Sequence, residues 1–123
     1  MLARIALSCL LLGGMAGAVS AEGSKEAIKI GVIMPLTGPY GGLGSETLNG
    51  ARVAADLINE AGGINGRKID LVVFDDKTSP DQSIIHFKNL KSQNVVGVVG
   101  SLFSNSAVAT APLAEAAKMP YVS

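Results

Sequence analysis

A strand that leads through a turn into a helix is the segment best suited to bind a ligand. Residues 95–100 are short and apolar, and a helix begins near Ser104. The first N–H groups of a helix have no partner within it and carry partial positive charge. A carboxylate placed there would accept hydrogen bonds from those groups and from a serine hydroxyl. Spacing alone favours a simpler interpretation, in which Ser104 only caps its own helix, with Asn105 or Ser106 as alternative caps.

The glycine-rich loop 35–44 is the second candidate for ligand contact. Its glycines allow the backbone to come close to a ligand. Tyr40 lies in this loop, either in a site or on the surface. The loop partly imitates a dinucleotide-binding fingerprint, but Thr47 replaces the third glycine and the segment between Met34 and Gly42 is too long for a tight phosphate turn. No nucleotide or other cofactor is expected.

Acidic and histidine side chains give little indication of catalysis. Asp75 and Asp76 end a strand, where a carboxylate pair suits acid–base chemistry or Mg²⁺. Neighbours on a strand point to opposite faces, so these two carboxylates need not share one site. A structural role in the loop is the simpler expectation. His86 is the only histidine and is expected at a solvated helix position. A single histidine without cysteines cannot form a typical zinc site, so no metal site is expected. Ser101 and Ser104 have no evident base, so we do not expect an enzyme.

Hydrophobic patterning predicts the elements that position these loops. Apolar runs and helical periodicity predict an alternation of strands and helices, βαβαβαβ, over residues 27–34, 45–61, 68–75, 80–91, 95–100, 104–118 and from 121 onward. Such an order favours an α/β fold with an open parallel sheet and helices on both faces. Ligands of such sheets bind beyond the carboxyl ends of the strands.

Local signals predict how these elements begin and end. Gly62 and Gly63 predict a helix stop, and Asn65-Gly66 predicts a tight turn before the next strand. Ser79, Pro80 and Gln82 form a capping box with proline at the first helical position. Pro112 should kink the last helix or delay its regular start.

The helix predicted for residues 45–61 has one apolar face. Its inward positions fall at helical spacing and comprise Leu48, Ala51, Ala55 and Ile58. Polar positions expected to face solvent are Arg52, Asp56, Asn59 and Glu60.

The first 21 residues resemble a secretory signal peptide. Arg4 is followed by an apolar stretch, and Val19-Ser20-Ala21 offers small residues for cleavage. Export would remove Cys9, the only cysteine, so the mature chain would have no thiol for disulfides or metals. Residues 22–123 contain nine basic and ten acidic side chains, a net charge of −1, with no basic stripe. Nucleic-acid binding is therefore not expected.

Residues 27–123 resemble the first lobe of type I periplasmic binding proteins, within the branch that carries branched-chain amino acids, amides, urea and aromatic acids. The segments 30–39, 58–76 and 98–106 look like that branch's opening strand and ligand loop, its first helix–strand connection, and its third strand and carboxylate-binding turn. The resemblance implies a periplasmic receptor that binds an amino acid of branched-chain type, or a related amide or carboxylate, between two lobes. The implied partners are the membrane subunits of an ABC importer.

The same resemblance implies ligand roles for individual residues. Ser104 matches the serine that grips the ligand carboxylate, with Asn105 beside it. Leu102 and Phe103 match positions that line the pocket. Leu43 stands where the family often has an aromatic residue, and Tyr40 is a candidate to replace that ring.

The resemblance leaves two questions open. A signalling receptor with the same fold is the alternative to an importer subunit, and a membrane span downstream of the missing C-terminus would favour it. Members of the family are far longer, so residues 22–123 are expected to be an incomplete N-terminal part of the first lobe. We expect such a part to bind little and to be weakly stable by itself.

Overall fold

The computed structural model describes residues 25–123, so the expected leader, residues 1–21 with Cys9, lies outside the described part of the chain. Strands and helices alternate as the sequence predicts. Their bounds are β1 (Ile28–Met34), α1 (Gly41–Glu60), β2 (Ile69–Asp75), α2 (Pro80–Ser92), β3 (Val98–Val99), α3 (Ser104–Ala116) and β4 (Tyr121–Val122).

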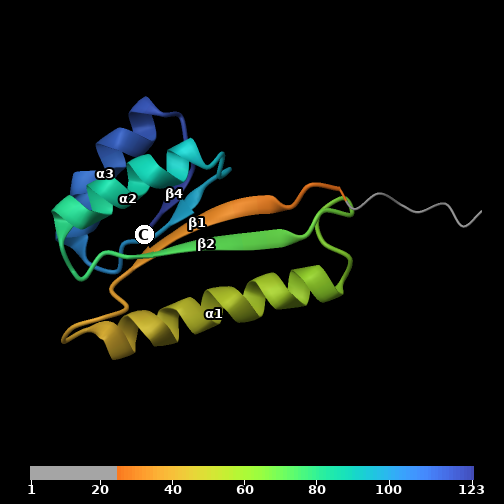
Figure 1. Ribbon diagram of the computed structural model, residues 1–123, viewed down its shortest axis with the longest axis horizontal. Coiled ribbons are helices and arrows are strands. Elements are labelled where there is room, and N and C mark those ends of the chain that lie inside the picture. The colour runs from red at the N-terminus through yellow and green to blue at the C-terminus, as the bar shows by residue number, and fades with distance from the viewer. Residues whose placement is uncertain (1–24) are drawn as a thin grey trace, which may run out of the picture.

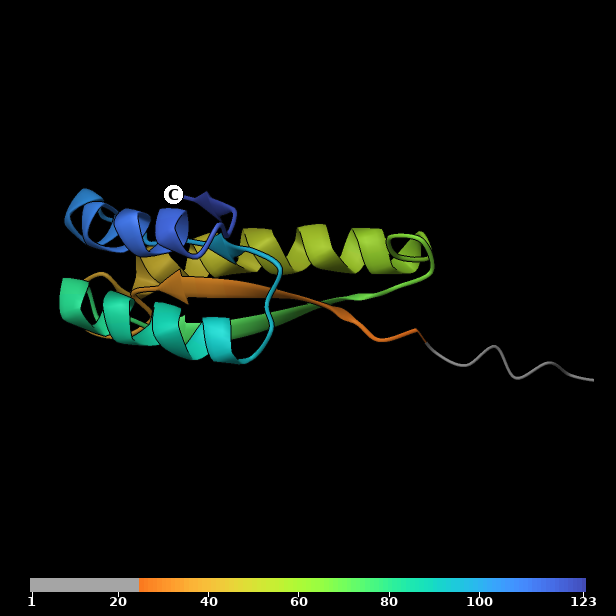
Figure 2. The same ribbon diagram turned by 90° about the horizontal axis from the view of Figure 1, so that it is seen from above.

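The four strands form one parallel sheet in the order β2-β1-β3-β4. Helix α1 covers one face of the sheet, and α2 and α3 lie side by side on the other (Figure 1). Figure 2 shows the same layers from above, with the beginnings of the helices at the end toward which β1 points. The expected parallel sheet with helices on both faces is confirmed.

Alternation along β1 divides the core between the two faces of the sheet. Ile33 packs with Phe87 and Leu90 on the side of α2 and α3. Val32 and Met34 pack with Leu48 of α1 on the opposite side. Because these side chains are at most 3% exposed, β1 is the buried centre of the fold.

Helix α1 begins at Gly41, not at residue 45 as the glycine-rich loop led us to expect. The glycines serve packing between protein segments here. A Cβ at Gly44 would overlap the backbone carbonyl of Pro35, and one at Gly41 would crowd the carbonyl of Leu36. The absence of side chains at these positions therefore lets the first turn of α1 lie directly on the end of β1.

The connection from α1 to β2 follows the predicted turn chemistry. Gly62 and Gly63 both have positive φ values, of 100° and 76°. Asn65 and Gly66 have φ values of 52° and 76°, and the turn closes with hydrogen bonds between Ile64 and Arg67. The helix end and the turn that follows it together reverse the chain direction, so β2 runs beside β1.

The later elements depart from prediction mainly in length. Ser79 caps α2 by accepting a hydrogen bond from the Gln82 backbone, with Pro80 at the first turn, as predicted. The box is not closed by the Gln82 side chain, because the Ser79 N–H donates to the Asp76 carbonyl instead. Helix α3 begins at Ser104 and continues through Pro112 to Ala116, so the proline does not delay its start. Strand β3 is limited to Val98–Val99, shorter than the predicted 95–100.

Two side chains expected in solvent take part in the packing instead. The Asn59 side chain pairs with both backbone groups of Ile69, at 2.7 Å and 2.9 Å. His86 is half-buried, stacks on Phe74 with ring centroids 4.7 Å apart, and contacts the Asp75 carbonyl through Nε2 at 3.0 Å. Those expectations were wrong because β2 lies within reach of both helices, which periodicity along one helix does not reveal.

Candidate functional site

The carboxyl ends of β1 and β3 bring the two predicted ligand loops together. Tyr40 and Leu43 stand at the start of α1, and the segment 102–105 stands at the start of α3. All six residues predicted to contact a ligand therefore lie at the same end of the sheet. In open parallel sheets this end is where ligands bind.

The first turn of α3 is open to solvent. Ser104 and Asn105 are exposed, and Phe103 is the N-cap residue, with no side-chain capping bond. Hence Ser104 does not cap its own helix, which was the simpler interpretation of its sequence position. The Asn105 side chain accepts a hydrogen bond from the Ser106 backbone N–H at 2.9 Å. The arrangement leaves the hydroxyl of Ser104 and the backbone N–H groups of Ser104 and Asn105 available to an anionic group, whereas the Ser106 N–H is already taken.

An aromatic contact joins the two loops. The rings of Tyr40 and Phe103 have centroids 4.7 Å apart and planes tilted by 58°. Tyr40 is 48% exposed, so it is partly a surface residue, yet its ring faces the α3 loop. Leu43 is 50% exposed and lies one turn further along α1. The structure thus groups Tyr40 with Phe103, whereas the sequence left the direction of Tyr40 open.

A small apolar cleft lies beside the β3–α3 turn. Its volume is about 180 Å³, and it is lined by Met34, Thr47, Val99, Gly100, Ser101, Leu102, Val122 and Ser123. Leu102 reaches into it from the turn and packs against the core cluster of Val32, Met34 and Leu48. The cleft therefore offers an apolar surface close to the start of α3.

Asp75 holds the β1–α1 loop at the edge of this site. Its carboxylate accepts hydrogen bonds from the backbone N–H of Leu36 at 2.8 Å and of Lys77 at 2.9 Å, and from the Thr37 hydroxyl at 2.6 Å. Burial alone would raise the pKa of Asp75, but the bonds from Thr37, Lys77 and Leu36 outweigh it and lower the pKa below its ordinary value. The carboxylate thus has the structural role that the sequence favoured.

Asp76 points away from Asp75 and contacts different segments. Its fully buried carboxylate accepts hydrogen bonds from the Thr78 backbone, from Ser83 at 2.8 Å, and from the Ser101 hydroxyl through a short hydrogen bond. The backbone N–H of Ser101 donates to the Tyr121 hydroxyl at 2.8 Å. Sequence reasoning missed this link because Asp76 and Ser101 are brought together across β1.

Tyr121 is also part of this buried group. Burial raises the pKa of its phenol above the ordinary value of 10, and the negative charge of Asp76 acts in the same direction. The phenol is therefore neutral at physiological pH and accepts the hydrogen bond from Ser101.

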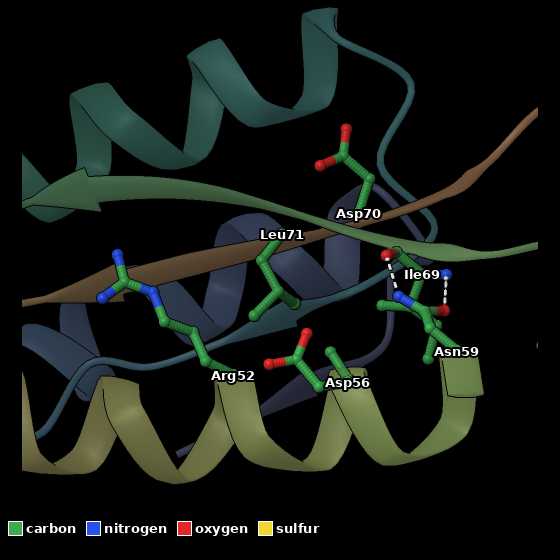
Figure 3. A pocket seen from close by; sticks show the side chains of 7 residues that line it. Arg52, Asp56, Asn59, Ile69, Asp70 and Leu71 are labelled. Carbon is green, nitrogen blue, oxygen red and sulfur yellow. Dashed lines mark hydrogen bonds between the residues drawn. The ribbon is translucent and has the colours of Figure 1, made fainter. Parts of the chain in front are cut away.

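A larger hollow of about 310 Å³ lies between α1 and the beginning of β2. Figure 3 shows its charged and polar side chains, with Asn59 paired to Ile69 at one end. Because Ile69 begins β2, this hollow faces the amino end of the strand. Its position argues against it as the primary ligand site.

Residues 25–123 show neither a candidate metal site nor a candidate membrane span. No group of three His, Cys, Asp or Glu side chains in this part of the chain has the arrangement of a metal site. None of the helices described here combines the length and apolar character needed to cross a membrane.

Comparisons with known proteins agree on one family. Residues 27–123 match the protein family described as "Periplasmic binding protein". Leu/Ile/Val-binding protein homolog 7 of Brucella abortus is 38% identical over 118 residues, which cover 95% of this chain and 28% of that protein. The Leu/Ile/Val-binding protein of Escherichia coli is 34% identical over 97 residues, covering 79% of this chain and 26% of that protein. The chain thus spans little more than a quarter of either relative.

Solved structures give the same result. The branched-chain amino acid transporter substrate-binding protein LivJ of Streptococcus pneumoniae, in complex with isoleucine, matches with a TM-score of 0.73 and 34% identity. The match covers 77% of this chain and 28% of LivJ. These relatives are binding proteins by name, in agreement with the expectation that the chain is not an enzyme.

Proposed function

The chain belongs to the periplasmic binding protein family, and from this premise we propose that it is part of an extracytoplasmic solute receptor for an ABC importer. Residues 22–123 then form an incomplete N-terminal part of the first of two lobes, and residues 1–21 are the export signal. The proposed ligand is an amino acid of branched-chain type, or a related small amide or carboxylate.

The observation that carries this proposal is the uncapped start of α3 beside an apolar cleft. A ligand carboxylate at this position accepts hydrogen bonds from the first N–H groups of α3 and from the Ser104 hydroxyl. An aliphatic side chain then enters the cleft next to Leu102. A ligand with one anionic group and one apolar group, such as an aliphatic amino acid, suits this combination of backbone N–H donors and an apolar cleft.

The aromatic pair supplies one wall of the proposed site. Tyr40 and Phe103 belong to different loops and contact each other at the rim. Leu43 and Asn105 lie beside them on the first turns of α1 and α3. Together with Leu102 and Ser104 they form the share of the ligand site that we assign to this lobe, and the ligand's amino group faces the second lobe.

Ligand screening of the full-length protein encoded by this gene tests the proposal. We expect leucine, isoleucine or valine to raise Tm, because a ligand at a hundredfold excess over Kd stabilises the folded state by about 2.7 kcal/mol. Sugars serve as the negative control. If no amino acid, amide or small carboxylate raises Tm or gives heat in calorimetry, the proposed function is wrong.

A further inference from the structure

The side chains of Asp76 and Tyr121 do not line the apolar cleft, but both bond to Ser101, which lines the cleft and begins the turn that leads to α3. Asp76 is 0% exposed, and its three hydrogen-bond donors are neutral groups from the Thr78 backbone, Ser83 and Ser101. A buried carboxylate is costly unless its oxygens are satisfied by donors. The Ser101 hydroxyl is therefore held firmly in one position by the end of β2.

The backbone of the same turn is held from the opposite side. The N–H of Ser101 donates to the Tyr121 hydroxyl at 2.8 Å, and the N–H of Gly100 donates to the Val122 carbonyl at 2.8 Å. Both acceptors belong to β4. Gly100 also packs so closely on β1 that a Cβ would overlap the Ile33 carbonyl. Gly100 and Ser101 are therefore constrained by three segments: the residue that follows β2, the strand β1 and the strand β4.

Ser104 and Asn105 have no comparable support from the rest of the fold. Both are exposed, and the N-cap residue Phe103 makes no side-chain capping bond. Their position depends on the direction in which the chain leaves Ser101, three residues before Ser104. A site held in advance binds more tightly because less freedom is lost on binding.

We propose that Asp76 and Tyr121 are positioning residues, which act through Ser101 to hold the start of α3 in the orientation that binds the ligand carboxylate. The inference rests on the proposed function of the α3 start. It adds that affinity depends on hydrogen bonds made by side chains that never touch the ligand.

Two variants remove one tether each without adding bulk. Ser101→Ala removes the hydroxyl bond to Asp76, and Tyr121→Phe removes the acceptor for the Ser101 N–H. Asn59→Ala is the matched control, because it removes two part-buried hydrogen bonds at the opposite end of β2 (Figure 3). All three should lower Tm, but only the first two should change the turn.

The measurement is Kd by calorimetry in the full-length protein with L-leucine, L-isoleucine and L-valine as probes, at a temperature where every variant is folded. We expect Ser101→Ala and Tyr121→Phe to raise Kd about three- to tenfold, and Asn59→Ala to leave it within about twofold. An unchanged Kd in both turn variants, or an equal rise in the control, would overturn the positioning role.

Amide hydrogen exchange gives a second readout that needs no ligand. Loss of either tether should speed exchange at the first hydrogen-bonded amides of α3, those of Ser106 and Ala107, whereas Asn59→Ala should leave these amides unchanged. If the wild-type protein binds none of the three probes, exchange still decides whether Ser101 holds the turn, separately from the ligand screen that tests the proposed function. Unaltered exchange in both turn variants would overturn the inference in either case.

Discussion

The rings of Tyr40 and Phe103 lie 4.7 Å apart and join the first turn of α1 to the first turn of α3. Each is the N-cap residue of its helix, so the contact ties together two loops that are 63 positions apart in the sequence. Tilted aromatic pairs at such distances contribute about 0.5–1.5 kcal/mol beyond the area they bury. The pair therefore adds a modest stabilisation to two loops that the adjacent strands β1 and β3 already bring together.

A double-mutant cycle measures this coupling. We expect Tyr40→Leu and Phe103→Leu to destabilise the protein by amounts that do not add, with an interaction energy of about 0.5–1 kcal/mol. Denaturant unfolding of the two single variants and the double variant gives the value. Additive effects within about 0.3 kcal/mol would mean that the rings do not stabilise each other.

Ser104 is expected to contribute directly to affinity. Its hydroxyl would bond a charged carboxylate, and such bonds are worth about 1.5–3 kcal/mol. Ser104→Ala should therefore weaken amino-acid binding about tenfold or more, with little change in Tm because the side chain is exposed and makes no capping bond. Calorimetry on the full-length protein measures it, and unchanged affinity would remove Ser104 from the site. Ser45→Ala, at an exposed position within α1, is the matched serine control.

Gly100 cannot accept a side chain without a shift of the backbone. Its φ is 125°, and a Cβ would overlap the carbonyl of Ile33. We expect Gly100→Ala to lower the free energy of unfolding by about 1–3 kcal/mol or more. Gly50→Ala is the matched control, because Gly50 lies inside α1 with open space around it, and should stabilise by about 0.5–1 kcal/mol. Thermal or denaturant unfolding that ranks the two variants in the reverse order would contradict this account.

Asp75 should make stability depend on acid pH. Its pKa is lowered in the folded protein by hydrogen bonds that outweigh burial, so its contribution is present above the unfolded-state pKa of about 3.9 and is lost as pH falls through the folded-state value. Asp75→Asn should therefore destabilise the protein at pH 7 and have a smaller effect at pH 3. Asp70→Asn, at an exposed position on the same strand, is the control. Equal destabilisation by Asp75→Asn at both pH values would show that the charge of Asp75 is not involved.

The sequence contains the signals that are local in the chain. Gly62-Gly63 and Asn65-Gly66 adopt the positive φ values that end a helix and form a turn. Ser79 and Pro80 begin a helix. The order of the elements and most of their ends therefore follow from neighbouring residues. The apolar run of residues 27–34 predicts a strand of a parallel sheet, whereas its place between β2 and β3 is known only from the tertiary structure. For Ser104, local spacing favoured a simple helix cap, and its proposed role with a ligand carboxylate came from the family resemblance; the structure then showed that Ser104 does not cap α3.

Other features depend on which segments meet in space, and spacing along one element does not encode them. The sequence predicted that Asn59 is solvated, but its side-chain amide bonds to β2 in the folded protein. It also predicted that Gly44 belongs to a ligand loop, but Gly44 allows α1 to pack on the Pro35 carbonyl. The link from Asp76 to Ser101 crosses β1 and joins residues 25 positions apart. Buried polar groups need hydrogen-bond partners. Which donor meets which acceptor depends on how the strands and helices pack, and the spacing of residues along the chain does not specify it.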